Sequence, residues 1–299
     1  MQLITIFTPT YNRAYTLPRL YQSLKEQSCK CFEWLIIDDG SKDNTYELIQ
    51  KWINETKDFQ IRYYKTSNGG KQRAINKGVH LAQYSYFFIV DSDDFLHKSA
   101  IENIIHWINT INEYENFAGV SGIKCKFNGE YLNNTHLLGE NKYIDGTNLE
   151  REKYNLTADM AEIYKTEILK KYPFPVWPDE KFTPECVVWD AIALDGYKIR
   201  WYNTPIYYCE YLEDGLTKSG YRLYNNNLMG CAMGTNTKLK SMKGINNKFK
   251  AIIEVLVACI LKGEYRYILQ TQYPIITLLL FPIGLIYSYR RKLIIKKYL

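Results

Sequence analysis

YFFIVDSDDFL, residues 86–96, is the stretch that decides the fold of this chain. Five apolar residues run directly into three carboxylates within four positions, Asp91, Asp93 and Asp94. A short apolar run of this kind is typical of a buried strand. Carboxylates so close together repel one another, and a nearby positive charge relieves the repulsion. We therefore expect a cation that the protein itself does not supply at the end of this strand.

The N-terminal third of the chain alternates between two hydrophobic periods. Strand-like runs occupy residues 3–8, 32–38, 59–65 and 85–90, and helical patterns occupy residues 17–24, 42–55, 70–82 and 98–111. Strands that alternate with helices at this spacing are joined by crossover connections. The pattern predicts an α/β fold, with a mostly parallel, Rossmann-like sheet flanked by helices on both faces.

The pattern changes after residue 115. Further strand-like runs occupy residues 117–127, 156–165, 198–203 and 205–212, with a loop or hairpin expected over 128–152 and a helix over 183–196. From about Lys248 the sequence becomes long and apolar. This part predicts a C-terminal helical extension.

Composition limits the classes of protein to which the chain can belong. Its 299 residues are 46% hydrophobic and 23% charged, which is ordinary for a chain that buries a core and excludes bulk disorder. The formal net charge is +6, and five positive charges lie in the last ten residues. The rest of the chain is nearly neutral, so we expect no nucleic-acid partner. Seven cysteines at irregular spacing match no zinc pattern and predict reduced thiols in a cytosolic protein.

A polar cluster follows each of the four predicted N-terminal strands. The clusters are TPTYNR (8–13), DDGS (38–41), TSNGGK (66–71) and DSDD (91–94). In open α/β sheets the ligand lies beyond the carboxyl ends of the strands, and all four clusters fall on that edge. Any one of them could be a simple turn. Together they predict a binding site.

The residue types in these clusters suit a nucleotide carrying a diphosphate. Hard carboxylate oxygens bind Mg²⁺ or Mn²⁺, which bridges to phosphates. Tyr11 could stack on a base, and the Arg13 guanidinium could face a phosphate. Asp38 and Asp39 could accept hydrogen bonds from a base or a ribose. The alternatives are local: a turn for TPTYNR, helix capping by Ser41 or Asp43 after the second strand, and helix capping by Asp93 or Asp94 after the fourth.

NGGK is not a Walker P-loop, because it lacks the four-residue spacer and the Lys-Ser/Thr ending. It still offers two glycines, Lys71 and a helix N-terminus, all of which suit an anion.

The four runs TPTYNR, WLIIDDGSKDNT, GGKQRAINKG and FFIVDSDD resemble the nucleotide-binding half of the family 2 glycosyltransferases, which have the GT-A fold. Residues 174–220 resemble the acceptor half of bacterial members that build cell-surface polysaccharides. The resemblance implies a nucleotide-sugar-binding half over 1–115, an acceptor-binding and catalytic half over 116–225, and a helical extension with a basic end over 226–299.

The resemblance also implies roles for individual residues. The nucleotide sugar would contact Pro9, Tyr11, Arg13, Asp38, Asp39, Lys71, Asp91 and Ser92. Asp93, together with Asp91, would bind the divalent metal, Mn²⁺ or Mg²⁺.

These enzymes are inverting: a base deprotonates an acceptor hydroxyl, which attacks the anomeric carbon as the nucleoside diphosphate leaves. In many relatives the base is the aspartate of a Glu-Asp pair, whereas this chain has Glu185-Cys186. A free cysteine has a pKa near about 8.5 and is a poor candidate. We expect Glu185 to be the base, with Asp190 as the second candidate. Either could instead be a carboxylate on a helix surface.

The tail contains YPIITLLLFPIGLIYSY (273–289), 17 residues without a charge, followed by a basic end. That length is at the lower limit for a membrane span, and Pro282 and Gly284 interrupt it. Nucleotide sugars are cytosolic and basic tails prefer the same side, so one crossing would not satisfy both. We expect a peripheral or re-entrant segment at the cytoplasmic face of the cell membrane. The alternative is a helix packed on the core or on another subunit.

The resulting hypothesis is an inverting glycosyltransferase that moves a sugar from a nucleotide sugar, expected to be a UDP-sugar, to a lipid-linked oligosaccharide acceptor. Two alternatives remain open, a non-catalytic nucleotide-sugar-binding partner subunit and a sugar-phosphate nucleotidyltransferase. The second normally has a glycine-rich basic loop after its first strand, which TPTYNRAYT lacks. The sequence leaves the sugar, the linkage and the oligomeric state undetermined.

Overall fold

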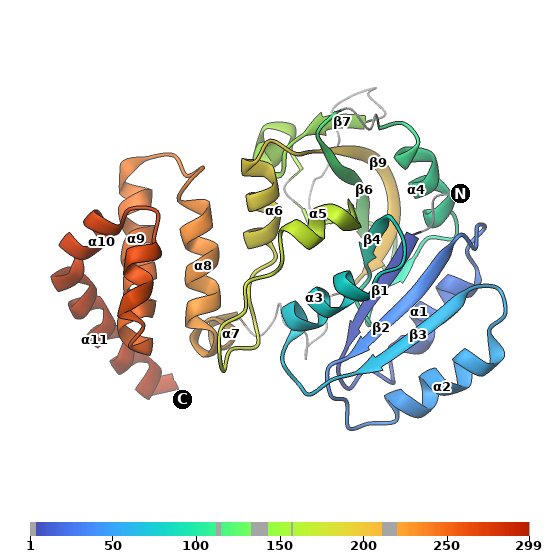
Figure 1. The fold of residues 1–299 in the computed structure, drawn as a ribbon, viewed down its shortest axis with the longest axis horizontal. Coiled ribbons are helices and arrows are strands. Elements are labelled where there is room, and N and C mark those ends of the chain that lie inside the picture. Colours follow the sequence, from blue (N-terminus) through green and yellow to red (C-terminus); the bar gives the residue numbers. More distant parts are fainter. Residues whose placement is uncertain (1–3, 112–114, 133–142, 157, 211–219, 299) are drawn as a thin grey trace. The chain divides into compact units, whose positions relative to one another are not determined.

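A computed structural model describes residues 4–111, 115–132, 143–156, 158–210 and 220–298. The chain divides into two compact units (Figure 1). The first contains Met1–Pro173 and Ile192–Tyr211, and the second contains Phe174–Ala191 and Leu212–Leu299. The functional division expected at residues 115 and 225 stays a prediction.

The first unit is built on one mixed sheet. Its strands are β1 (Ile4–Thr10), β2 (Phe32–Asp38), β3 (Gln60–Lys65), β4 (Tyr86–Ile89), β5 (Phe95–Leu96), β6 (Phe117–Lys126), β7 (Tyr143–Gly146), β8 (Met160–Lys165) and β9 (Lys198–Cys209). The order is β3-β2-β1-β4-β8-β6-β9-β5, with β7 also paired to β9. The first four strands are parallel, as predicted. From β8 onward antiparallel pairs enter the sheet, so it is less uniformly parallel than expected.

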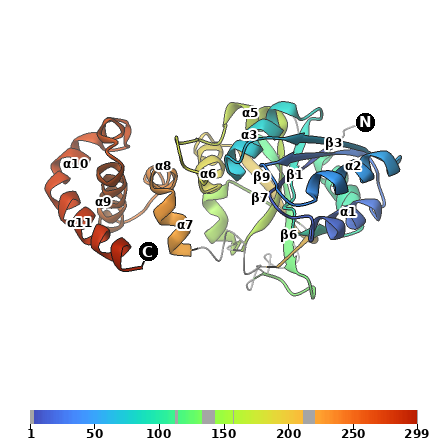
Figure 2. The same cartoon turned by 90° about the horizontal axis from the view of Figure 1, so that it is seen from below.

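Helices cover both faces of the parallel strands. They are α1 (Leu17–Lys25), α2 (Thr45–Glu55), α3 (Lys71–Leu81), α4 (Ala100–Ile108) and α5 (Thr166–Lys171), with a 3₁₀ helix at Asn148–Tyr154. Leu20 of α1, Trp52 of α2 and Ile104 of α4 share one apolar core with the side chains on one face of the sheet. Helix α3 lies on the opposite face, near α5 (Figure 2). The layers agree with the predicted arrangement.

Gly78 allows α3 to lie close to the sheet. A Cβ atom at this position would be only 2.3 Å from Cε2 of Phe7 on β1. No other residue type fits such a contact without a shift of the helix. The contact lies in the C-terminal half of α3, and Lys71 begins the helix at its other end.

Strand β9 joins two runs that the sequence suggests are separate. Pro205 interrupts the pattern between them, and proline has no N–H to donate to a neighbouring strand. In the structure Pro205 pairs with Ile123 of β6, where the register shifts on both sides. An irregularity of this kind accommodates proline inside a strand.

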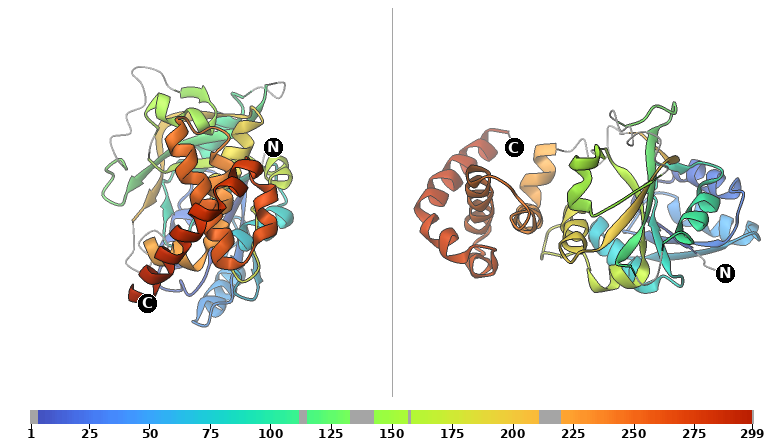
Figure 3. Two further views of the ribbon diagram at one scale, coloured as in Figure 1. Left: turned by 90° about the vertical axis from the view of Figure 1, so that its left-hand side faces the viewer. Right: turned by 90° about the horizontal axis from the view of Figure 1, so that it is seen from above.

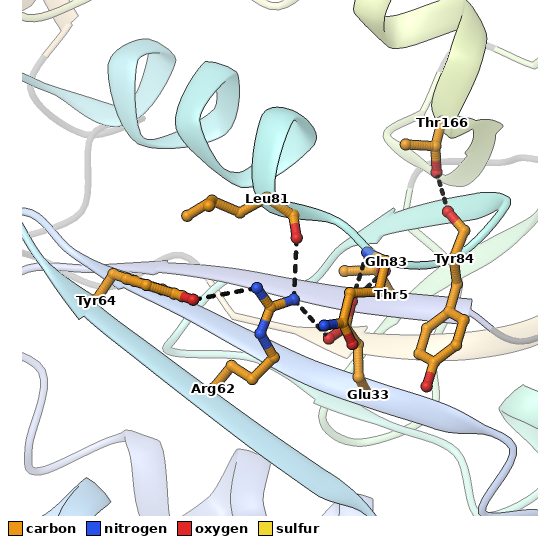
Figure 4. A network of polar contacts seen from close by, with 8 residues as sticks. All are labelled: Thr5, Glu33, Arg62, Tyr64, Leu81, Gln83, Tyr84 and Thr166. Atoms are coloured by element: carbon orange, nitrogen blue, oxygen red, sulfur yellow. Dashed lines mark hydrogen bonds and ion pairs between the residues drawn. The ribbon is translucent and has the colours of Figure 1, made fainter.

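A buried ion pair lies between the parallel strands and the end of α3 (Figure 4). Glu33 Oε2 is 2.9 Å from Arg62 Nη1, and the Glu33 side chain is fully buried. Glu33 Oε1 accepts hydrogen bonds from the hydroxyl of Thr5 and the N–H of Gln83, at 2.7 and 3.0 Å. Arg62 also donates to the carbonyl of Leu81 at 2.9 Å. The pair therefore links β1, β2 and β3 to the end of α3.

The second unit is helical in its C-terminal part. After α6 (Cys186–Leu194), which begins in this unit, it contains α7 (Gly220–Asn226), α8 (Leu228–Lys238), α9 (Ile245–Lys262), a 3₁₀ helix at Tyr265–Gln270, α10 (Pro274–Leu279) and α11 (Phe281–Tyr298). Helix α9 packs against both α8 and α11 (Figure 3). Among the residues that the structure describes, no helix has the length and apolarity needed to cross a membrane. The membrane association of this extension stays a prediction.

The Glu33–Arg62 pair generates a prediction about stability. Glu33→Ala should lower the free energy of unfolding by about 3–5 kcal/mol, because it leaves the Arg62 charge in a mostly buried place without its partner. The double substitution E33L/R62M should lose less than Glu33→Ala, since it removes both charges. Urea denaturation followed by circular dichroism measures both.

Glu55→Ala is the matched control, because Glu55 forms an exposed pair with Lys51 at 3.9 Å. Surface pairs contribute little, so this change should hardly move the unfolding midpoint. Equal effects of Glu33→Ala and Glu55→Ala would contradict the proposed importance of the buried pair.

Candidate functional site

The register of the parallel strands brings their carboxyl ends level. Thr10 of β1 pairs with Asp38 of β2, and Asp38 pairs with Lys65 of β3. Phe7 of β1 pairs with Ile89 of β4. The loops that follow these strands therefore leave the sheet at one edge. The predicted convergence of the four polar clusters is confirmed, as the contacts between them demonstrate.

The first and second loops are joined through Asn12. Its backbone φ of 51° is left-handed, a conformation that asparagine tolerates better than most residues. The Asn12 N–H donates to Ser41 Oγ at 2.9 Å, and Asn12 Oδ1 accepts the N–H of Lys42 at 2.8 Å. Asp43 Oδ2 accepts the N–H of Ala14 at 3.0 Å. The sequence analysis did not single out Asn12, although asparagine in a loop after a strand is a common turn signal.

Asp38 is fully buried and holds the start of the second loop. Its Oδ1 accepts the N–H of Ser41 at 2.7 Å, and its Oδ2 accepts the hydroxyl of Tyr63 at 2.5 Å. Both carboxylate oxygens therefore have partners within the protein. The predicted contact of Asp38 with a base or ribose stays a prediction.

Asp39 organises the third loop. Its Oδ1 accepts the N–H of Gly69 at 2.7 Å, and its Oδ2 accepts the N–H of Gly70 at 2.8 Å. The side-chain amide of Asn68 donates to Asp39 as well, at 3.2 Å. Gly70 has a φ of 96°, so glycine suits the position directly before α3. Asp39 thus links the second cluster to the third.

Lys71 links the third cluster to the fourth. Its Nζ lies 2.7 Å from Oδ1 of Asp91. Burial opposes ionisation of Asp91, but Lys71 and Lys124 outweigh it and lower the pKa of this carboxyl below its usual value. Lys71 therefore lies beside the acidic end of β4, where the third and fourth polar clusters meet. Its predicted contact with a diphosphate stays a prediction.

The other two acids of the fourth cluster have raised pKa values. We call Asp91, Asp93 and Asp94 the acidic cluster. Burial, together with the charge of Asp91, raises the pKa of Asp94 to about 7. Burial and Asp91 also raise the pKa of Asp93. Both shifts mean that the acidic cluster would gain stability from a further positive charge.

Tyr207 of β9 supports the acidic cluster from the second half of the sheet. Its hydroxyl donates to Asp94 Oδ2 at 2.6 Å and accepts the N–H of Asp91 at 3.0 Å. Lys124 Nζ lies 4.4 Å from the centre of the Tyr207 ring. Tyr207 and Lys124 were not predicted as site residues, because each lies in a strand pattern with no local sign of a role at the site.

Arg19 is a third residue that the sequence analysis missed. It donates a hydrogen bond to the carbonyl of Asp93. Its guanidinium carbon lies 4.0 Å from the centre of the Phe127 ring and 5.6 Å from that of Phe95. Arg19 is an exposed residue of an amphipathic helix, so the sequence suggests a solvent-facing position. The contact with Asp93 depends on packing between segments distant in the chain.

The remaining donor-site candidates lie on the same edge. The Tyr11 side chain is 43% exposed and thus accessible to a ligand, whereas Ser92 is buried. Arg13 Nη1 donates to the Tyr15 hydroxyl at 3.1 Å. Pro9 occupies the end of β1, beside Ile37 of β2. Their contacts with a nucleotide sugar stay predictions.

The acidic cluster can be compared with the requirements of a divalent metal. In the described part of the chain, no three His, Cys, Asp or Glu side chains form a complete set of ligands. A Mg²⁺ ion that binds with substrate phosphates needs only one or two protein carboxylates, because phosphate oxygens and water complete its shell. Asp91 and Asp93 offer hard oxygens of this kind. The cluster therefore fits a cation that binds together with a diphosphate.

The base candidates belong to the second unit. Glu185 directly precedes α6, and its carbonyl accepts the N–H groups of Val188 and Trp189 at 3.0 and 3.2 Å. Asp190 is buried one turn further along the helix. Burial raises the pKa of the Cys186 thiol, despite the nearby Lys238. The thiol therefore stays protonated near neutral pH, which disfavours Cys186 as a base.

Comparisons with known proteins agree with the fold and the loops described above. The model of the family "Glycosyl transferase family 2" matches residues 5–172. An uncharacterized glycosyltransferase of Rickettsia felis is 34% identical over 133 residues, which are 44% of this chain but only 21% of that protein. An uncharacterized glycosyltransferase of Haemophilus influenzae is 28% identical over 191 residues, 62% of this chain and 72% of that protein.

The crystal structure of Staphylococcus aureus TarS 1-349 in complex with UDP-GlcNAc has the same fold. It superposes with a TM-score of 0.62 and 18% identity, over 97% of this chain and 92% of that one. The expected GT-A fold is thus confirmed as a mixed α/β sheet with flanking helices. Because the family model covers more than half of the chain, and includes all four loops that meet at the sheet edge, this chain belongs to family 2 of the glycosyltransferases.

Proposed function

We propose that this protein transfers a sugar from a UDP-sugar to a saccharide acceptor, with inversion at the anomeric carbon. The observation that carries the proposal is the convergence of four loops on the acidic cluster, where Asp93 and Asp94 have raised pKa values. A nucleoside diphosphate would bind to the four loops, and the divalent cation bound with it would supply the positive charge that the carboxylates of the acidic cluster require. The UDP-GlcNAc complex of TarS supports UDP as the nucleotide.

The loops would divide the donor between them. Tyr11 offers an exposed ring on which the base would stack. Asp39 holds the backbone of Gly69 and Gly70 in place, so that Lys71 and the start of α3 present positive charge to the phosphates. Asp93 and Asp91 would hold Mn²⁺ or Mg²⁺, which neutralises charge on the leaving diphosphate when bound.

Glu185 is the proposed base for the acceptor hydroxyl. It directly precedes α6, in the place where relatives carry a Glu-Asp pair according to the resemblance. Asp190 is the second candidate. One alternative function is that of a non-catalytic nucleotide-sugar binder, because Cys186 stands where the resemblance implies the catalytic aspartate and its raised pKa makes the thiol a poor base.

The proposed acceptor is a lipid-linked saccharide at the cytoplasmic face of the cell membrane, in the synthesis of a bacterial surface polysaccharide. Two features support it: the resemblance of residues 174–220 to acceptor halves of such enzymes, and the apolar tail with its basic end. Nucleotide sugars are cytosolic, which places the donor site on that side of the membrane.

Metal-dependent donor binding gives the first test of this function. UDP should bind with micromolar affinity in the presence of Mn²⁺, and binding should weaken at least about tenfold when the metal is omitted or in Asp93→Asn, which removes a charged ligand. Isothermal titration calorimetry measures each case. Asp58→Asn, which changes an exposed aspartate before β3, is the control and should bind UDP like the wild type. Equal UDP affinity with and without metal would reject the metal role of the acidic cluster.

Stacking of the base on Tyr11 can be tested separately. Tyr11→Ala should weaken UDP binding about fivefold to a hundredfold, since stacking of a base on an aromatic ring contributes about 1–3 kcal/mol. Tyr11→Phe keeps the ring and should retain the affinity. The same loss in both variants would attribute the effect to the hydroxyl group and exclude stacking.

The base can be separated from the donor site by comparing transfer with binding. Glu185→Gln should reduce sugar transfer by about 10²–10⁴-fold, the usual contribution of general base catalysis, while UDP affinity stays unchanged. Cys186→Ser should retain transfer. The measurement is release of UDP in the presence of a saccharide acceptor. If Glu185→Gln remains active and Asp190→Asn does not, Asp190 is the base.

A further inference from the structure

Helices α10 and α11 turn their large apolar side chains outward. Ile275 and Leu279 of α10 are 73% and 75% exposed, and Ile286 of α11 is 58% exposed. Other exposed apolar residues of the two helices are Ile276, Leu278, Ile283, Leu285, Tyr287, Tyr289, Leu293 and Ile294. We call these eleven residues the outer face.

Small and polar residues occupy the buried side of the same helices. Thr277, Gly284 and Ser288 are buried, although each carries little or no apolar surface. The Thr277 hydroxyl is 3.1 Å from that of Thr271. A soluble helix normally shows the reverse arrangement, with its apolar stripe toward the core.

Close packing against α9 fixes this orientation. A Cβ atom on Gly284 would lie 2.5 Å from Cδ2 of Leu256 and 3.1 Å from Cδ1 of Ile260, so α11 approaches α9 more closely than a larger residue would allow. Helices in an apolar solvent pack in this way, through small residues that bring backbones together. Rotating α11 to bury its leucines would lose this contact. The outer face is therefore a consequence of the packing.

Such a face requires an apolar environment. Monomeric soluble proteins rarely expose contiguous apolar patches of more than a few hundred Å², and larger patches mark protein or membrane contacts. Helix α9 does not cover the outer face, because it packs against the opposite, buried side of α11.

Charge distinguishes between a lipid surface and a second copy of the chain. The sequence after Glu264 contains six basic residues, Arg266, Arg290, Arg291, Lys292, Lys296 and Lys297, and no acidic residue. Arg290 and Lys292 are exposed beside the outer face. A symmetric dimer built on this face would bring two like-charged segments together. An anionic bilayer instead complements the charge, and Tyr287 and Tyr289 suit its headgroup region.

We propose that the outer face of α10 and α11 binds the surface of an anionic lipid bilayer, with its apolar side chains in the headgroup and upper acyl region. Since α9 covers the other side, the two helices lie along the surface. The inference deepens the acceptor part of the proposed function, on which it rests, because both depend on the apolar tail with its basic end. It is independent of the donor chemistry of the first unit. A failure of vesicle binding would remove this support for a lipid-linked acceptor and leave the donor site untouched, whereas a failure of UDP binding would leave the outer face untouched.

Vesicle flotation of the full chain tests the apolar part of the proposal. The protein should float with vesicles of phosphatidylcholine and phosphatidylglycerol, and L279N/I286N should reduce the bound fraction at least about tenfold by removing apolar anchors. L279M/I286M keeps the apolar surface at the same positions and should bind like the wild type. UDP titration of each variant reports that the protein remains folded and that its donor site is unaffected.

The electrostatic part has its own variants. R290Q/K292Q should weaken binding to the anionic vesicles several-fold, and binding of the wild type should fall with added salt and on vesicles of phosphatidylcholine alone. K51Q/K57Q removes two charges elsewhere and should have no effect. Arg291 stays unchanged in these variants, because it donates to Asn225 Oδ1 at 3.0 Å and supports the packing of α11.

Two results would overturn the proposal. The first is that wild-type protein stays unbound with anionic vesicles at low salt. The second is that size-exclusion chromatography with light scattering finds a dimer that L279N/I286N converts to a monomer, with no lipid binding by either form. That outcome would assign the outer face to a second copy of the chain.

Discussion

The register of the four parallel strands is the constraint on which the candidate site depends. With Thr10 opposite Asp38 and Asp38 opposite Lys65, the loops after β1, β2 and β3 leave the sheet at one level. A slip by one residue would turn every side chain of a strand to the other face. The apolar residues on both faces of the sheet therefore position the loops as well as stabilise the fold, and the buried Glu33–Arg62 pair links three of the same strands.

The acidic cluster combines rigid support with an imbalance of charge. Tyr207 and Arg19 hold its backbone and side chains from distant parts of the sheet and from α1. Lys71 and Lys124 keep the pKa of Asp91 low, yet the pKa values of Asp93 and Asp94 stay raised. The protein thus fixes the geometry of the acidic cluster but does not neutralise all of its negative charge. A bound ligand would supply the remaining positive charge. Asp38 and Asp39 accept hydrogen bonds from the second and third loops, so they hold these loops in place at the sheet edge.

Helices α10 and α11 use their apolar residues differently from the rest of the protein core. The first unit buries its isoleucines, leucines and tryptophans between the sheet and its helices. The second unit also has a buried apolar cluster, formed around α8 and α9. Its α10 and α11, in contrast, bury threonine, glycine and serine and expose leucine and isoleucine, which is the arrangement expected of helices that lie against an apolar surface.

Hydrophobic period and short motifs are local properties of a chain, so the sequence was enough to predict three features. These are the alternation of strands and helices in the N-terminal third, the convergence of four polar clusters and the resemblance to the family. The folded structure was needed for the antiparallel pairs after β4, the path of β9 through Pro205 and the recruitment of Arg19, Lys124 and Tyr207. These features depend on contacts between residues that are far apart in the sequence, and no local pattern predicts such contacts. Tyr207 and Asp94, for example, are more than a hundred positions apart. The outward orientation of Ile286 likewise follows from how Gly284 of the same helix packs on α9, since apolar composition alone does not say which side of a helix is buried.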